Sequence, residues 1–328
     1  MQDKPIFVVF GATGAQGGSV VSAFLDCDRL CSQYRIRAVC RDTSKPAAEL
    51  LKVKGVEVVS ANLSFEPEIR VALSGAQVIF LVTDYNGNAC DPRLEFQQGK
   101  VVADVAKDIG VHHLIFSSLF SVSEYTSDSI RGANEFDSKA KIEEHIRNLD
   151  IPATFVFAGF YMSLFEPGQY LTRSREVEGN LKLELPVSAE NSQFPLIDTP
   201  RDFGKFVISA MLKRDSLLGA NVYAAEDYYT LNQIADIVNG LEPSAGQRCY
   251  VKELSDEEFL GSKPHSGTDA QEREMERLSM YQFLRQFGYY GGASLDSSHK
   301  ILDQPLRTFE EFVRSTPGFD SDLRVEIA

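Results

Sequence analysis

Three glycines near the start of the chain have the spacing of a phosphate-binding turn. Gly11, Gly14 and Gly17 follow the apolar run Ile6 to Phe10 directly. Because glycine has no Cβ atom, a diphosphate can approach the backbone closely, and the unpaired N–H groups of a following helix attract its negative charge. We therefore expect a dinucleotide at this position, with a tight turn that binds no ligand as the alternative.

A basic residue follows the next apolar segment. Tyr34 to Cys40 is predicted to form a strand, and Arg41 comes directly after it. In a nucleotide-binding βαβ unit this position faces the adenosine ribose, where an acid would bind a 2′-hydroxyl and an arginine a 2′-phosphate. Arg41, with Lys45 four residues later, favours NADP, with NAD as the weaker cofactor. Asp42 could partly neutralise Arg41, and a solvated surface cation is the alternative interpretation of either basic residue.

Polar residues also follow the third and fourth predicted strands. Asn62 lies just past Val56 to Val59, where its amide could meet an adenine edge, and a turn residue is the alternative. Val78 to Val82 is followed by Thr83-Asp84-Tyr85. Open parallel sheets bind ligands at the carboxyl ends of their strands, so we expect these three residues to border the cofactor.

Strands and helices alternate over about half of the chain. This pattern predicts an α/β protein with a doubly wound parallel sheet. We expect strands at 6–10, 34–40, 56–59, 78–82, 113–116 and 153–158, and helices at 19–25, 46–52, 94–109 and 139–149.

From residue 159 onwards the alternation loosens. We expect a helix at Phe203 to Met211 with Asp202 as its N-cap, and an edge strand at Asn221 to Ala224. Further predictions are an extended segment at 181–187, helices at 230–238 and 308–313, a capping box at 255–258, a flexible break at 261–267, and a helix at 268–287 with Met275, Leu278, Phe283 and Leu284 inward. The predicted domains are 1–158 with 195–228 returning to it, and a smaller one of 159–194 and 229–328.

Composition excludes several classes of protein. The 328 residues carry a net charge of −14, which would repel nucleic acid but attract a basic protein partner. Five scattered cysteines favour reduced thiols over a disulfide framework, and we expect no metal site. No apolar run approaches the ~20 residues that span a bilayer, and the first residues lack a signal layout. We therefore expect a cytoplasmic protein without a membrane contact.

Three stretches resemble the NmrA-like family of atypical short-chain dehydrogenases, which includes fungal nitrogen regulators and a human redox sensor. They are residues 9–20, Arg41-Asp42 with Lys45, and Phe136-Asp137-Ser138-Lys139 followed by Glu143. The resemblance implies an NADP-binding Rossmann domain, a small α/β domain beside it and a cleft between them. It also implies an aromatic and polar cluster over the nicotinamide near Tyr161. The expected cofactor-binding residues are Gly11, Thr13, Gly14, Ala15, Gln16, Gly17, Arg41, Lys45, Asn62, Thr83, Tyr85, Lys139 and Tyr161.

The catalytic tyrosine of ordinary short-chain dehydrogenases is missing. These enzymes use Tyr-x-x-x-Lys, in which the lysine lowers the pKa of the tyrosine that transfers the proton. Lys139 fits the lysine, yet position 135 is Glu135, and no tyrosine of the chain has a lysine four residues later. Ser118 lies where the family's substrate-orienting serine would be. Lys139 is a ribose-binding residue, a general base or a plain surface lysine.

Two functions remain open. The absent proton donor favours a non-catalytic NADP-binding regulator or redox sensor, a monomer or homodimer of the cytoplasm and also the nucleus. Its partner would be basic, such as a GATA-type zinc-finger transcription factor. The alternative is an NADPH-dependent reductase of a quinone, an imine or another small unsaturated substrate. Lys139 and Ser118 would then be catalytic, and Phe155 to Phe165 would line the substrate pocket.

Overall fold

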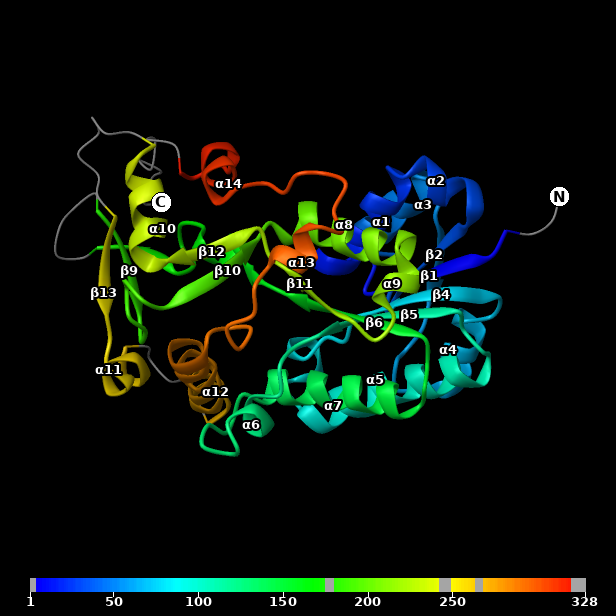
Figure 1. The fold of residues 1–328 in the computed structure, drawn as a ribbon, viewed down its shortest axis with the longest axis horizontal. Coiled ribbons are helices and arrows are strands. Elements are labelled where there is room, and N and C mark those ends of the chain that lie inside the picture. Colours follow the sequence, from blue (N-terminus) through cyan, green and yellow to red (C-terminus); the bar gives the residue numbers. More distant parts are fainter. Residues whose placement is uncertain (1–3, 175–179, 242–248, 263–267, 320–328) are drawn as a thin grey trace.

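A seven-stranded parallel sheet forms the larger part of the protein (Figure 1). The computed structural model describes residues 4–174, 180–241, 249–262 and 268–319. The strand order is β11-β6-β5-β4-β1-β2-β3. The chain adds β2 and β3 on one side of β1 and the later strands, from β4 on, on the other side, which confirms the predicted doubly wound sheet. The strands are β1 (Ile6–Phe10), β2 (Arg35–Cys40), β3 (Glu57–Ser60), β4 (Ala76–Leu81), β5 (His113–Ser118), β6 (Ala153–Ala158) and β11 (Asn221–Ala224).

Helices cover both faces of this sheet (Figure 1). One face carries α1 (Ala15–Leu25), α2 (Asp28–Gln33), α3 (Pro46–Val53), α8 (Thr199–Leu212) and α9 (Arg214–Leu217), and the other carries α4 (Glu66–Ala72), α5 (Pro92–Asp108) and α7 (Asn134–Asn148). Glycines set how closely two helix pairs approach. A Cβ on Gly204 of α8 would overlap the carbonyl of Ser19 in α1, and one on Gly99 of α5 would lie 2.6 Å from Ile142 of α7. The helices are therefore fixed over the sheet by close backbone packing.

Two three-stranded sheets and several helices make up the smaller part. β10 (Gln193–Ile197) lies between β7 (Phe160–Tyr161) and β12 (Asp227–Thr230), and β9 (Leu181–Leu185) lies between β8 (Leu171–Arg173) and β13 (Cys249–Glu253). The helices are α10 (Leu231–Asn239), α11 (Asp256–Gly261), α12 (Thr268–Phe287), α13 (Asp296–His299) and α14 (Phe309–Ser315), and the short elements η1 (Asn86–Asn88), α6 (Val122–Tyr125) and η2 (Met162–Phe165) complete the set. The predicted domain limits stay a prediction.

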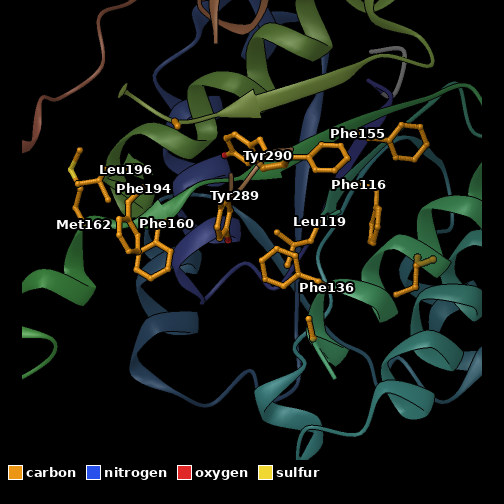
Figure 2. Close-up of a cluster of buried hydrophobic side chains, with 14 of the residues drawn as sticks. Phe116, Leu119, Phe136, Phe155, Phe160, Met162, Phe194, Leu196, Tyr289 and Tyr290 are labelled. Carbon is orange, nitrogen blue, oxygen red and sulfur yellow. Dashed lines mark hydrogen bonds between the residues drawn. The ribbon is translucent and has the colours of Figure 1, made fainter. Parts of the chain in front are cut away.

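Buried aromatic side chains connect the two parts (Figure 2). The Phe160 ring lies 5.0 Å from that of Phe194 and 5.9 Å from that of Tyr289 between ring centroids. Next to it, the hydroxyl of Tyr290 donates to the carbonyl of Phe157 at 2.9 Å, so the segment before α13 is tied to β6. This continuous core holds the smaller part against the carboxyl ends of the large sheet.

Two local predictions are wrong. Asp202 is not an N-cap, because α8 begins at Thr199, and its carboxylate instead accepts the backbone N–H of Arg307 at 2.7 Å. Met275 is 45% exposed, since the neighbouring Glu274 takes the inward position at that turn of α12.

The capping box at Ser255 is confirmed. The predicted break at 261–267 lies, beyond residue 262, outside the described residues. No helix in the described ranges is both long and apolar enough to cross a membrane.

Candidate functional site

The glycine turn forms an open cradle at the end of β1. Gly11 has a φ of +63°, a conformation that side chains rarely adopt, and a Cβ on Gly17 would overlap the Gly11 carbonyl. Gly14 is the N-cap of α1, and no side chain caps the first N–H groups of this helix. The turn therefore leaves helix N–H groups uncovered beside closely packed backbone, which suits a diphosphate.

A groove with a volume of about 450 Å³ runs from this cradle along the carboxyl ends of the strands. Lys45, the exception among the predicted cofactor residues, is exposed and does not line it. The structure brings the other twelve together along its walls: Gly11, Thr13, Gly14, Ala15, Gln16, Gly17, Arg41, Asn62, Thr83, Tyr85, Lys139 and Tyr161.

The end of the groove at β2 contains an ion pair that the sequence did not predict. Arg41 Nη2 lies 3.0 Å from Asp84 Oδ2. Asp42 turns away, because its carboxylate accepts the N–H and the hydroxyl of Ser44. Asn62 lines the groove, and its side chain also accepts the N–H of Ser64 at 2.9 Å, as a turn residue does.

A second cavity of about 350 Å³, here called the side cavity, adjoins the other end of the groove. Apolar groups such as Leu119, Phe136 and Phe160 line it, and α12 contributes one helix face. The residues of that face, spaced i, i+3, i+4 and i+7, are Arg273, Glu276, Arg277 and Met280. Both cavities share Gln16, Tyr85, Asn86, Glu135, Lys139 and Tyr161. These shared residues form the junction of the two cavities.

Lys139 is buried at this junction and paired. Its Nζ lies 2.5 Å from Oε1 of Glu95, a completely buried carboxylate on α5. Glu95 also accepts hydrogen bonds from the hydroxyls of Thr83, at 2.7 Å, and Ser138. Glu135, in the place of the missing tyrosine, lies 3.7 Å from Lys139 Nζ. The interpretation of Lys139 as a surface lysine is therefore wrong.

Tyr161 reaches the junction from β7. Its hydroxyl oxygen accepts a hydrogen bond from Gln16 Nε2 at 2.8 Å. Burial raises the pKa of Tyr161 to about 12, so the hydroxyl keeps its proton at neutral pH. The other amide atom, Gln16 Oε1, is buried and has no hydrogen-bond partner among the described residues. The junction thus offers a ligand both an acceptor and a phenolic O–H.

A second tyrosine at the junction is tied to α12. The hydroxyl of Tyr85 donates to Glu276 Oε2 at 3.0 Å, and Glu276 Oε1 accepts the backbone N–H of Glu135 at 2.9 Å. Burial raises the pKa of Glu276 and is also the main cause of the raised pKa of Tyr85. Glu276 therefore fixes α12 to the start of α7. No sequence motif marks it, because its partners are far away along the chain.

Ser118 is not brought to the site. It is fully buried, and its hydroxyl donates to Glu143 Oε2 at 2.5 Å. Ser117 lines the side cavity instead, since successive strand side chains point to opposite faces. The prediction for Ser118 is therefore wrong. The Phe155 to Phe165 prediction holds for only part of that segment, because the cavity is lined by Ala158, Gly159, Phe160, Tyr161 and Leu164.

Comparisons with known proteins identify relatives of the chain. The chain is 29% identical over 251 residues to the NmrA-like family domain-containing oxidoreductase cpsB of Aspergillus campestris, and the aligned region covers 71% of each protein. The fold of the chain is similar to that of NmrA, a negative transcriptional regulator, in complex with NADP. The TM-score is 0.76, with 20% identity over 96% of this chain and 95% of that one.

A reductase has a similar fold. The triphenylmethane reductase of Citrobacter sp., complexed with NADP(H), gives a TM-score of 0.70 at 21% identity over 94% of this chain and 98% of that one. At these identities the two solved structures show a shared fold and no more. The family assignment has a separate basis, because the sequence model of the NmrA-like family matches residues 3–313, nearly the whole chain. The chain belongs to the NmrA-like family.

Proposed function

We propose that the protein is an NADPH-dependent oxidoreductase that reduces a small unsaturated compound in the side cavity. The observation that carries the proposal is that cavity, which adjoins the groove along Gln16, Lys139 and Tyr161. Hydride transfer needs a substrate held against the reactive end of a dinucleotide and shielded from water. The side cavity offers such a place beside the groove.

The groove fits a dinucleotide on several points. The glycine cradle leaves room that a Cβ would fill, and Arg41 lines the end where an adenosine phosphate would lie. Buried Gln16 Oε1 is an acceptor in need of a donor at the junction. Solved proteins of the same fold are complexes with NADP, NAD and NADP(H). When bound, the reduced nicotinamide supplies the hydride.

The proton must come from the chain, and Tyr161 is the residue best placed to give it. Its oxygen accepts from Gln16 Nε2, so its own hydrogen stays available for a substrate oxygen or nitrogen. The hydrogen of Tyr85 is committed to Glu276, and Lys139 is held by Glu95. Tyr161 would thus replace the tyrosine absent from position 135, while Lys139 fixes the ribose side of the junction.

The lining of the side cavity indicates the class of substrate. Polar side chains lie at the junction and on the α12 face, while Leu119, Phe136, Phe160 and Tyr289 present apolar and aromatic surface. Such a surface favours a flat, uncharged acceptor whose C=O, C=N or C=C bond reaches Tyr161. Quinones, imines and enones have this chemistry, and curated relatives of the chain are named oxidoreductases.

A regulator with a basic protein partner is the second candidate. The net charge of −14 favours it, because the charge would attract a basic surface. Glu135 in the tyrosine's place also agrees with binding that is not followed by turnover. This candidate requires dinucleotide binding and makes no use of the side cavity.

Turnover decides between the two. We expect NADPH oxidation, followed at 340 nm, with at least one member of a panel of quinones, imines and enones. Tyr161→Phe should lower kcat about 10²- to 10⁴-fold, the usual contribution of a positioned acid, and leave NADPH binding within about 3-fold. Tyr34→Phe, which changes a tyrosine outside both cavities, is the matched control and should keep full activity. NADPH binding without reduction of any acceptor would refute the oxidoreductase and favour the regulator.

A further inference from the structure

The ion pair at the adenosine end of the groove joins the ends of two strands that flank β1. Arg41 follows β2 and Asp84 lies three residues past β4, and both line the groove. Arg41 Nη2 lies 3.0 Å from Asp84 Oδ2, while Asp84 Oδ1 accepts the N–H of Gly87 at 2.8 Å. One carboxylate therefore holds both the arginine and the start of the loop after β4.

The loop is built to allow this contact. A Cβ on Gly87 would overlap the Asp84 carboxylate and would lie 3.0 Å from Arg41 Nη1. In this conformation the loop backbone, the carboxylate and the guanidinium are in close contact. Both side chains are more than half exposed, so they can shift when a ligand binds.

We propose that Asp84 sets the balance between NADP and NAD in this protein. The inference rests on the proposed dinucleotide binding and concerns only its adenosine end. A 2′-phosphate would have to draw Arg41 away from Asp84 and then lie near an uncompensated carboxylate, which repels it. The 2′-hydroxyl of NAD meets no such repulsion and can donate to a carboxylate at this position. Arg41 thus favours NADP, and Asp84 opposes part of that preference.

The neighbouring acids do not take this role. Asp42 is adjacent to Arg41 in the sequence, but its carboxylate accepts the N–H and the hydroxyl hydrogen of Ser44. Glu57, on the strand beside β2, pairs with Arg37 at 2.9 Å. Among the described residues, Asp84 is the acid that forms an ion pair with Arg41.

Calorimetric titration of NADP and NAD tests the inference without any turnover. Asp84→Asn keeps an oxygen for the Gly87 N–H and removes the charge. We expect it to raise the ratio of NADP to NAD affinity about 10-fold at low salt, and about 3-fold or less at 0.5 M salt, where charge effects are screened. Asp42→Asn is the matched control and should leave the ratio within about 2-fold. Arg41→Ala should lower the ratio about 10-fold or more.

The outcomes separate this inference from the proposed function. If the wild-type protein binds neither dinucleotide, the proposed function and the inference both fail. If it binds both and Asp84→Asn leaves the ratio unchanged, the inference alone is overturned. Asp84→Ser supplies a second measurement with a smaller side chain, and it should change the ratio in the same direction. A ratio that falls in both variants would mean that Asp84 supports the phosphate, contrary to the inference.

Discussion

Replacement of Glu95 should destabilise the protein strongly, because it would leave a buried lysine without its counter-ion. The side chain of Glu95 is completely buried and that of Lys139 is 6% exposed. Glu95 also accepts the hydroxyl hydrogens of Thr83 and Ser138, so three donors lose their acceptor together. The nearest other carboxylate, that of Glu135, is 3.7 Å from the ammonium and 40% exposed, and it can replace only part of the interaction.

The magnitude follows from the cost of an unpaired buried charge. Removing one partner of a buried ion pair typically costs about 3–5 kcal/mol of unfolding free energy. We expect Glu95→Ala to fall in that range and Glu95→Gln, which keeps acceptor capacity, to cost about 2–3 kcal/mol. Glu310→Gln is the matched control, because Glu310 forms an exposed pair with Arg314 at 2.7 Å and should change stability by less than about 1 kcal/mol.

Urea unfolding followed by linear extrapolation measures these differences. A double variant separates the charge from the loss of packing. Replacing the pair with apolar groups of similar volume, Glu95→Leu with Lys139→Met, should recover at least about 2 kcal/mol relative to Glu95→Ala, since no charge is then left buried. A loss below about 1 kcal/mol in Glu95→Ala would refute the reasoning, and so would a double variant less stable than Glu95→Ala.

Two further predictions concern the cradle and a partly buried acid. Gly17→Ala should abolish dinucleotide binding in calorimetry, because its methyl group would overlap the Gly11 carbonyl. Gly18→Ala is the control and should bind normally, because its methyl group would lie 3.5 Å from the nearest atom. Equal binding by both variants would contradict this prediction. Burial raises the pKa of Glu226 to about 7, so its contribution to stability is full below about pH 4.5 and is lost as the pH rises through 7. Since Glu226 is partly exposed, we expect the unfolding free energy measured with urea to fall by roughly 1–2 kcal/mol between pH 5 and pH 8. Glu226→Gln should remove this pH dependence. A variant that keeps it would refute the assignment.

The sequence was sufficient for the sheet because its strands are apolar on both faces. Ile6 to Phe10 is buried at every position, as a central parallel strand requires. The starts of α1 and α7 were predicted too late. Helix α1 begins at Ala15 and α7 at Asn134, four and five residues before the predicted starts at 19 and 139. The first turns of both helices carry mostly small and polar residues, so the apolar pattern that marks a helix begins later in the sequence.

The groove was more predictable than the side cavity for a physical reason. Groove residues follow strand ends, and a strand end is visible in the sequence as the point where an apolar run stops. The side cavity takes one wall from α12, whose Glu276 lies 191 residues from its partner Tyr85. Glu276 looks like any solvated helix residue in the sequence, since its hydrogen bonds are made with Tyr85, in the loop after β4, and with the start of α7.

The missing tyrosine shows the limit of a motif argument. Glu135 occupies the tyrosine's place along α7, but the chemistry depends on a hydroxyl at the junction of the two cavities and not on its sequence position. Tyr161 brings that hydroxyl from β7, and Gln16 orients it from the helix that follows the glycine turn. The cradle and the proposed proton donor are thus linked by one hydrogen bond. Gln16→Leu should consequently impair turnover more than NADPH binding, whereas a protein that only senses the dinucleotide would show no such separation.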